Sequence, residues 1–269
     1  MVRNDEFFLR KWVDYYGTEL GKSNLYIYLD GKDQPVPEWC AGTTVVACDK
    51  IKGKVIQAEK ERLRFLSERA AELLERYDLV IGTDADEFIA PDPALGISLS
   101  EYLDRAHVRT SISPLGIDVG QHMATEGNID DSIPFLSQRK YGLLSTRYTK
   151  TSIIARPLTW GSGFHRVKGH DFHIAKGLYL FHFGYFDMKR IQDRFNDKDR
   201  AAAGWERHIA KRTRTINLVS GKKARNWEKW TSLARIIQQI ARPPYALNKP
   251  GMLEMKIVVR IPDRFSKIV

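Results

Sequence analysis

The sequence has few cysteines, no long apolar run and no glycine-rich phosphate loop. Cys40 and Cys48 are its only cysteines, and their number and spacing exclude a structural zinc site or a disulfide framework. No apolar run approaches the roughly 20 residues that cross a bilayer, and the first residues lack the apolar core of a signal peptide. A glycine-rich loop of the Walker or dinucleotide-binding type is also absent. These absences predict a reducing, cytoplasmic setting.

Charge is distributed unevenly along the chain. Its 269 residues are 43% hydrophobic and 28% charged, which predicts an ordinary globular protein with one large α/β domain, with or without a helical appendage. Residues 187–269 hold 20 Lys and Arg against 8 Asp and Glu, a net charge of +12, whereas residues 1–186 carry a net charge of −2. Such a basic segment indicates an anionic partner: nucleic acid, a membrane surface or an anionic polymer.

Helical and strand patterns alternate through the first third of the chain. Asn4 is a candidate cap for the first helix, and Gly17 is a candidate stop. This alternation favours an α/β fold with a mostly parallel sheet flanked by helices. Helices are predicted over 4–17, 59–77 and 100–106, strands over 25–29, 43–47, 79–81 and 178–183, short strands and loops over 109–157, and a mainly helical region after 187.

An acidic cluster follows the apolar run at 79–81. A strand so apolar is predicted to be buried on both faces, and parallel sheets place ligands beyond the carboxyl ends of their strands. Asp84 and Asp86 are two residues apart, so their side chains point to the same side of an extended backbone. Two converging carboxylates repel each other unless a cation lies between them, and oxygen ligands suit Mg²⁺ or Mn²⁺. The alternative is a solvated acidic turn.

Six short segments occur in a characteristic order along the chain. They are Val2-Arg3-Asn4-Asp5-Glu6, Tyr28-Leu29-Asp30-Gly31-Lys32-Asp33, Asp84-Ala85-Asp86-Glu87-Phe88, Tyr148-Thr149-Lys150-Thr151, Gly163-Phe164-His165-Arg166 and Phe181-His182-Phe183-Gly184-Tyr185. Together they resemble the family 2-type glycosyltransferases with the GT-A nucleotide-sugar-binding fold, in particular a small bacterial branch associated with polysaccharide synthesis. The resemblance implies a GT-A core over 1–186 and a basic, mainly helical region over 187–269 packed on that core.

The resemblance also implies a reaction and a metal site. A sugar would pass from a nucleotide-diphospho-sugar donor to a saccharide or lipid-linked acceptor, with inversion and with Mg²⁺ or Mn²⁺. Asp86 would contact the metal, and Asp84 the ribose or the metal through water. Asp30 ends a predicted strand, where it would accept hydrogen bonds from the ribose or base, although it is equally suited to a turn. Glu87 would orient its neighbours.

Histidines and further carboxylates supply the other candidates. His182 lies in an apolar strand pattern and is the preferred second metal or pyrophosphate ligand, the alternative being a half-buried structural histidine. Lys150 and His165 are predicted to meet phosphate or acceptor. Asp118 is the preferred catalytic base that takes the proton of the acceptor hydroxyl, and Glu126 is the other candidate.

The basic region mixes aromatic rings with its cations. Such a mixture suits a membrane interface, and it also suits an acidic glycan. The alternative is a helical cap whose apolar side chains pack on the core while its cations are solvated. The aromatic residues are Trp205, Trp227, Trp230 and Tyr245, and the candidate packing residues are Trp230, Leu233, Ile237 and Ile240.

Two rival functions fit parts of the sequence. A sugar-nucleotide nucleotidyltransferase would use a similar sheet, but its glycine-rich basic loop is missing. A basic nucleic-acid-binding protein would explain the +12 region but not the acidic motif. We therefore expect a glycosyltransferase in the cytoplasm, with peripheral contact to the inner face of the membrane and no nucleic-acid partner.

Overall fold

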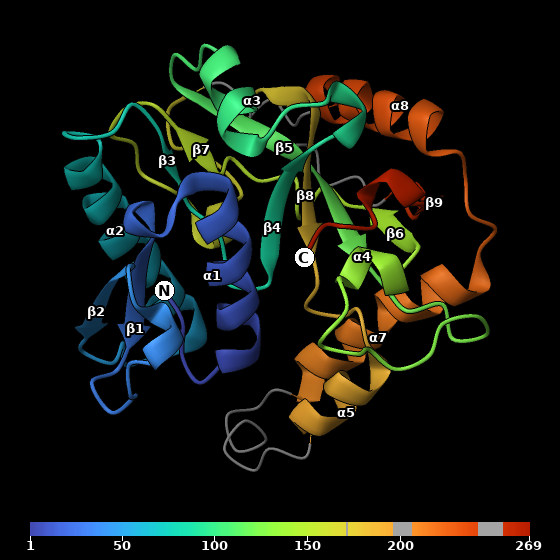
Figure 1. Ribbon diagram of the computed structural model, residues 1–269, viewed down its shortest axis with the longest axis horizontal. Coiled ribbons are helices and arrows are strands. Elements are labelled where there is room, and N and C mark those ends of the chain that lie inside the picture. The colour runs from blue at the N-terminus through green and yellow to red at the C-terminus, as the bar shows by residue number, and fades with distance from the viewer. Residues whose placement is uncertain (171, 196–205, 242–254) are drawn as a thin grey trace.

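The computed structural model describes residues 1–170, 172–195, 206–241 and 255–269, and its fold is mixed α/β (Figure 1). Trp205 and Tyr245, two of the aromatic residues noted above, lie outside the described residues. Within the described part, no helix combines the length and the apolar character that a membrane span requires.

A seven-stranded sheet forms the centre of the molecule. Its order is β3-β7-β5-β6-β9, and β8 pairs with both β4 and β5. Only the β5–β8 pair is parallel within this sheet, so the prediction of a mostly parallel sheet is not confirmed. The strands are β3 (Val80–Ile81), β4 (Glu87–Pro91), β5 (Ser111–Val119), β6 (Tyr141–Leu144), β7 (Ile153–Ile154), β8 (Ile174–His182) and β9 (Val258–Arg260).

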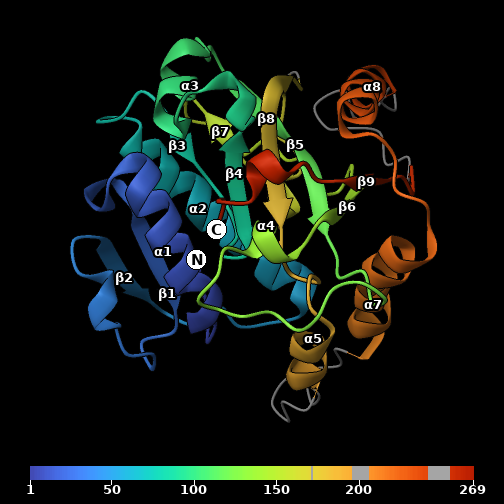
Figure 2. The same cartoon turned by 45° about the vertical axis from the view of Figure 1, so that its right-hand side comes forward.

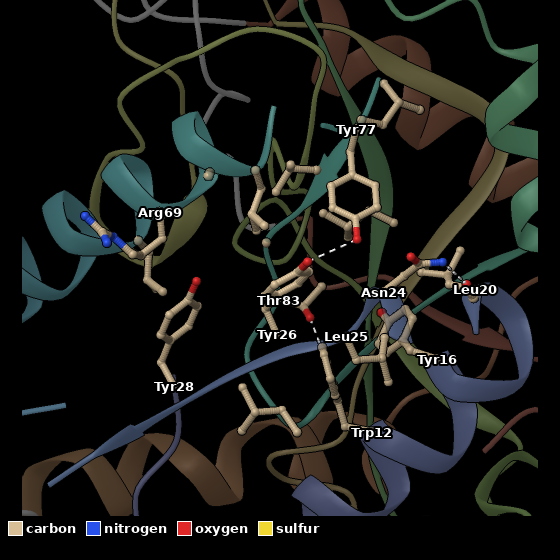
Figure 3. Close-up of a pocket in the computed structure, with 18 of the residues that line it drawn as sticks. Trp12, Tyr16, Leu20, Asn24, Leu25, Tyr26, Tyr28, Arg69, Tyr77 and Thr83 are labelled. Carbon is tan, nitrogen blue, oxygen red and sulfur yellow. Dashed lines mark hydrogen bonds between the residues drawn. The ribbon is translucent and has the colours of Figure 1, made fainter. Parts of the chain in front are cut away.

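A separate two-stranded parallel sheet joins β1 (Tyr26–Asp30) to β2 (Thr44–Cys48), and Val2 bridges to Leu29. A cavity of about 600 Å³ lies between β1 and the segment around β3 (Figure 3). Val80 and Ile81 border this cavity and are only half-buried. The prediction that strand 79–81 is buried on both faces was therefore wrong, because the side chains of this segment border the cavity.

The helices surround these sheets. They are α1 (Glu6–Leu20), α2 (Val55–Leu73), α3 (Leu99–Arg105), α4 (Phe135–Gln138), α5 (Met188–Phe195), α7 (Glu206–Gly221) and α8 (Trp227–Ile240), and short 3-10 turns cover Lys22–Asn24, Glu38–Cys40, Pro93–Leu95, Ser162–Phe164 and Asp263–Phe265. Asn4 does not cap α1: its backbone has a φ of 47° and its N–H donates to the side chain of Gln34, so Asp5 occupies the cap position.

Helix α1 fixes the beginning of β4, which carries the acidic motif. The ring of Tyr16 stacks on Phe88 at a centroid distance of 6.2 Å. The Tyr16 hydroxyl donates to the carbonyl of Glu87 and accepts from the N–H of Ile89. These contacts occupy a carbonyl and an N–H on the same edge of β4, so β4 starts at a defined position relative to α1. Figures 1 and 2 show α1 between the β1–β2 pair and β4.

The region after Asp187 contains α5, α7, α8 and β9. Strand β9 pairs with β6, so this region also extends the central sheet. Asp187, where this region begins, forms a buried ion pair: Nη2 of Arg139 lies 2.8 Å from Oδ2 of Asp187, and both side chains are almost fully buried. Leu233 and Ile240 are exposed, so the alternative in which both pack on the core was wrong for these two residues.

Replacing Arg139 by methionine will destabilise the fold strongly. The change keeps the bulk of the side chain but leaves the Asp187 carboxylate buried without its cation, a situation that costs about 3–5 kcal/mol. Arg64 pairs with Glu68 on the exposed side of α2, so the matched change Arg64→Met will cost less than about 1 kcal/mol. The free energy of unfolding in urea measures both, and equal losses would contradict this account of the buried pair.

Candidate functional site

Strand register places three chemically active side chains in one row. Glu87 on β4 is the direct partner of His182 on β8, and His182 is in turn the direct partner of Asp118 on β5. Directly opposite residues on neighbouring strands project to the same face of a sheet. Glu87, His182 and Asp118 are therefore brought together although they are far apart in the sequence.

Asp86, Glu87 and His182 form a cluster able to hold a metal ion, with ligand atoms within 4.8 Å of one another. Oδ2 of Asp86 lies 3.5 Å from Nε2 of His182. On an ion with bonds of about 2.1 Å, two ligand atoms at a right angle lie about 3 Å apart, so this pair fits with little movement. The N–H of Phe183 donates to the carbonyl of Asp86 and ties the motif to β8.

The buried ammonium of Lys150 lies behind this cluster. Its Nζ is 3.0 Å from Asp84 and 2.5 Å from Glu87, and the side chain is 3% exposed. Burial alone would lower the pKa of Lys150, but Asp84 and Glu87 raise it above its usual value. Burial would raise the pKa of Asp84, but Lys150 and Arg62 hold it well below its usual range. Burial raises the pKa of Glu87 to about 7.

The site gathers acidic groups and their cationic partners. Asp84, Asp86, Glu87 and Asp118 bring four carboxyl groups, and Lys150, Arg62 and His182 pair with them. Arg62 is also shared with Glu59. A cation held by Asp86 and His182 would take the place of the proton on the imidazole and balance the neighbouring carboxylates.

Asp118 holds His182 in a fixed orientation. Its Oδ1 lies 2.7 Å from Nδ1 of His182, and the hydroxyl of Thr215 on α7 donates to its Oδ2 at 2.5 Å. A carboxylate accepts hydrogen bonds, so Nδ1 carries the proton and Nε2 points toward Asp86. The ring of Tyr148 stacks on the imidazole at 3.7 Å. Although burial alone would lower the pKa of His182, Asp86 and Asp118 raise it well above its usual value.

This geometry argues against Asp118 as the catalytic base. The side chain is buried and both oxygens are engaged, so it acts through His182. Glu126, the other candidate, accepts from the backbone N–H groups of His122 and Lys140, which makes it an anchor of its loop.

His165, Asp30 and Asp33 have different surroundings. His165 lies within electrostatic reach of Lys150 and Asp84, and burial lowers its pKa to about 3, so the imidazole is neutral. Asp30 ends β1, and its Oδ1 accepts from the N–H of Ile51, which ties the segment after β2 to the end of β1. Asp33, from the second of the six segments, is exposed and pairs with Arg3.

Sequence reasoning missed Arg62 and Thr215. Arg62 lies on α2 and Thr215 on α7, each within an ordinary polar helical stretch that gives no local signal. Tyr148 was noted only as part of a segment with Lys150. Their roles depend on tertiary contacts with Asp84, Asp118 and His182.

The cavity between β1 and β3 extends to the acidic motif. It reaches Gly82, Thr83 and Ala85, immediately before Asp86. Trp12 donates its indole N–H to the Thr83 hydroxyl at 2.9 Å, and the hydroxyls of Tyr26 and Tyr77 lie 3.0 Å apart across it (Figure 3). A cluster able to hold a cation and an aromatic-lined cavity are thus neighbours, an arrangement that suits a ligand with an anionic and a flat apolar part.

Comparisons with known proteins give no relatives. A scan against protein-family models finds no match, and a search of curated proteins also finds none.

A methyl group at position 184 will disturb the metal cluster. A Cβ on Gly184 would lie 2.6 Å from Nε2 of His182 and 2.9 Å from Oδ2 of Asp86, so Gly184→Ala will separate these two ligands and lower Mn²⁺ affinity by at least about tenfold. Gly127→Ala is the control, because no atom lies within 4 Å of its added Cβ. Titration calorimetry with Mn²⁺ tests both, and unchanged affinity in Gly184→Ala would refute the assignment of these ligands.

The Thr215 hydroxyl will matter to metal binding through Asp118. Thr215→Val keeps the shape of the side chain but removes the donor to Asp118, so Mn²⁺ affinity will fall by about tenfold or more, as outer-sphere changes do. Thr215→Ser will restore it. Ser220 lies on the same helix and bonds to Met123 and Gln121 instead, so Ser220→Ala will leave Mn²⁺ affinity unchanged. Equal Mn²⁺ affinity in the valine and serine variants would show that the hydroxyl has no such role.

Proposed function

We propose that the protein is a metal-dependent glycosyltransferase. It moves a sugar from a nucleotide-diphospho-sugar donor to a saccharide or lipid-linked acceptor in polysaccharide synthesis. The observation that carries the proposal is the cluster of Asp86, Glu87 and His182 beside an aromatic-lined cavity. The resemblance of the surrounding segments to family 2-type glycosyltransferases supports the same reaction.

The ligand set favours Mn²⁺ over Mg²⁺. Mg²⁺ strongly prefers oxygen ligands in a strict octahedron, whereas an imidazole nitrogen suits later divalent metals. The described cluster offers two carboxylates and one imidazole. When bound, such an ion neutralises the negative charge that develops on the departing diphosphate.

Each residue of the chain then has a defined task. Asp86 and His182 hold the ion, and Asp118 keeps Nε2 of His182 directed at it. Oδ1 of Asp84 accepts a hydrogen bond from Arg62, and Oδ2 accepts one from Lys150. We infer that Asp84 positions these two cations near the donor phosphates and is not itself a metal ligand. Glu87 is the inner carboxylate, almost fully buried against Lys150.

The surroundings of the cluster suggest where the donor lies. The cavity that ends at Thr83 and Ala85 offers aromatic faces for the nucleoside, and the neutral His165 lies near Lys150 on the phosphate side. The transfer is a direct displacement that inverts the anomeric centre. The protein acts in the cytoplasm at the inner face of the membrane, where a lipid-linked or growing glycan acceptor is available, and its basic region makes the contact.

Donor binding will require both the metal and Asp86. In a thermal-shift screen, nucleotide-diphospho-sugars with Mn²⁺ will raise the melting temperature, because a ligand that binds only the native state stabilises it. Asp86→Asn will lose this response and the transfer of sugar while its unliganded melting temperature stays near that of the wild type. Asp33→Asn is the control, because Asp33 is exposed and pairs with Arg3.

Two results would decide against the proposal. Equal donor affinity in EDTA and in Mn²⁺ would show that the metal has no role in donor binding. Release of diphosphate from a nucleoside triphosphate and a sugar phosphate, without transfer to an acceptor, would identify a nucleotidyltransferase instead.

A further inference from the structure

Helix α8 uses one face to pack on the protein. Trp227, Thr231, Ala234 and Gln238 are buried and lie at helical spacing on this inner face. The side-chain carbonyl of Gln238 accepts from the Thr149 hydroxyl at 2.6 Å. The inner face is therefore fully engaged with the core, and its contacts include the loop that carries Lys150.

The opposite face of α8 is also apolar, yet it is exposed. Leu233, Ile236 and Ile240 are 36%, 46% and 74% exposed. At about 100° per residue, these three side chains fall within about 60° of one another and on the side away from Gln238. Figure 2 shows α8 at the periphery of the molecule. We call Leu233, Ile236 and Ile240 the outer stripe.

Cations accompany the outer stripe. Lys229 is exposed and lies at an angle between Ile236 and Ile240 around the helix, and Lys222 and Lys223 are exposed just before α8 begins. Glu228, the acidic residue of the helix, is paired with Arg264. Lys229 thus lies within the stripe, and Lys222 and Lys223 precede the helix that carries it.

We propose that α8 docks on an anionic lipid surface. The outer stripe enters the boundary between head groups and acyl chains, and Lys222, Lys223 and Lys229 meet the anionic head groups. Amphipathic helices bind membranes by this combination of buried apolar area and charge attraction. An acidic glycan would satisfy the cations but would leave the stripe in water, so the stripe favours the lipid surface. The proposal does not depend on the metal site.

Apolar insertion and charge attraction together give measurable affinity for a vesicle where either alone gives little. Each cation near an anionic surface contributes about fivefold to binding, and the stripe adds an apolar contribution that salt does not screen. The wild-type protein will therefore bind vesicles of phosphatidylcholine with about 30% phosphatidylserine, a composition that imitates an anionic leaflet. Pure phosphatidylcholine vesicles will bind far less.

Vesicle co-sedimentation of the full chain tests the two contributions separately. Ile236→Asn with Ile240→Asn will weaken binding by at least about tenfold, because the outer stripe loses its apolar surface. Ile56 on α2 is 74% exposed, as Ile240 is, so Ile56→Asn is the matched control and will bind as the wild type does. Lys222→Glu with Lys223→Glu will weaken binding by about 25-fold or more, whereas the same reversal at the exposed Lys52 and Lys54 will have little effect.

The results separate the alternatives. Failure of the wild type to bind anionic vesicles, or undiminished binding by the stripe variant, would overturn the proposal. Binding of heparin that is as tight as vesicle binding and unchanged in the stripe variant would identify a polyanion site instead. Loss of vesicle binding in both variants, with circular dichroism and melting temperature unchanged, would support lipid docking by α8.

Discussion

The pairing of β8 with β4 on one edge and β5 on the other determines the chemistry of this molecule. It sets His182 between Glu87 and Asp118, and the hydrogen bond from Phe183 to Asp86 brings the remaining carboxylate to the same place. A shift of one residue in either ladder would turn His182 to the opposite face of the sheet. The packing of Tyr16 against β4 and the parallel β5–β8 pair are therefore conditions for the site as well as for the core.

Electrostatics then divides the acidic groups into distinct roles. Lys150 and Arg62 neutralise Asp84, and Lys150 also contacts Glu87 from behind. Asp86 and His182 instead lie 3.5 Å from each other, and the Asp86 side chain is 24% exposed. Removing buried charges from water is costly, so an arrangement of this kind persists only if partners or a bound cation balance it. Acids placed close together in the sequence thus differ in function because their neighbours differ.

Local patterns predicted part of this arrangement. The spacing of Asp84 and Asp86 and the strand around His182 were visible in the sequence, and so was the α/β character. The role of Asp118 could not be predicted in this way, because it depends on a cross-strand partner and on Thr215, which lies 97 residues further along the chain. The exposure of the outer stripe of α8 was also unpredictable: helical periodicity identifies an apolar face and predicts that it is buried, whereas the buried face of α8 carries Thr231 and Gln238.

The cavity beside β3 interrupts the backbone ladder between the two sheets. Strand β1 pairs with β2 and with Val2, and in the described chain β3 pairs only with β7. Among the described residues, the β1–β2 pair is thus attached to the rest through side chains, including those of α1 and α2, and not through backbone hydrogen bonds. Cooperative unfolding units usually follow such boundaries. We expect amide hydrogens in β1 and β2 to exchange through a partial opening that leaves the large sheet intact, so that one polypeptide behaves as two foldons.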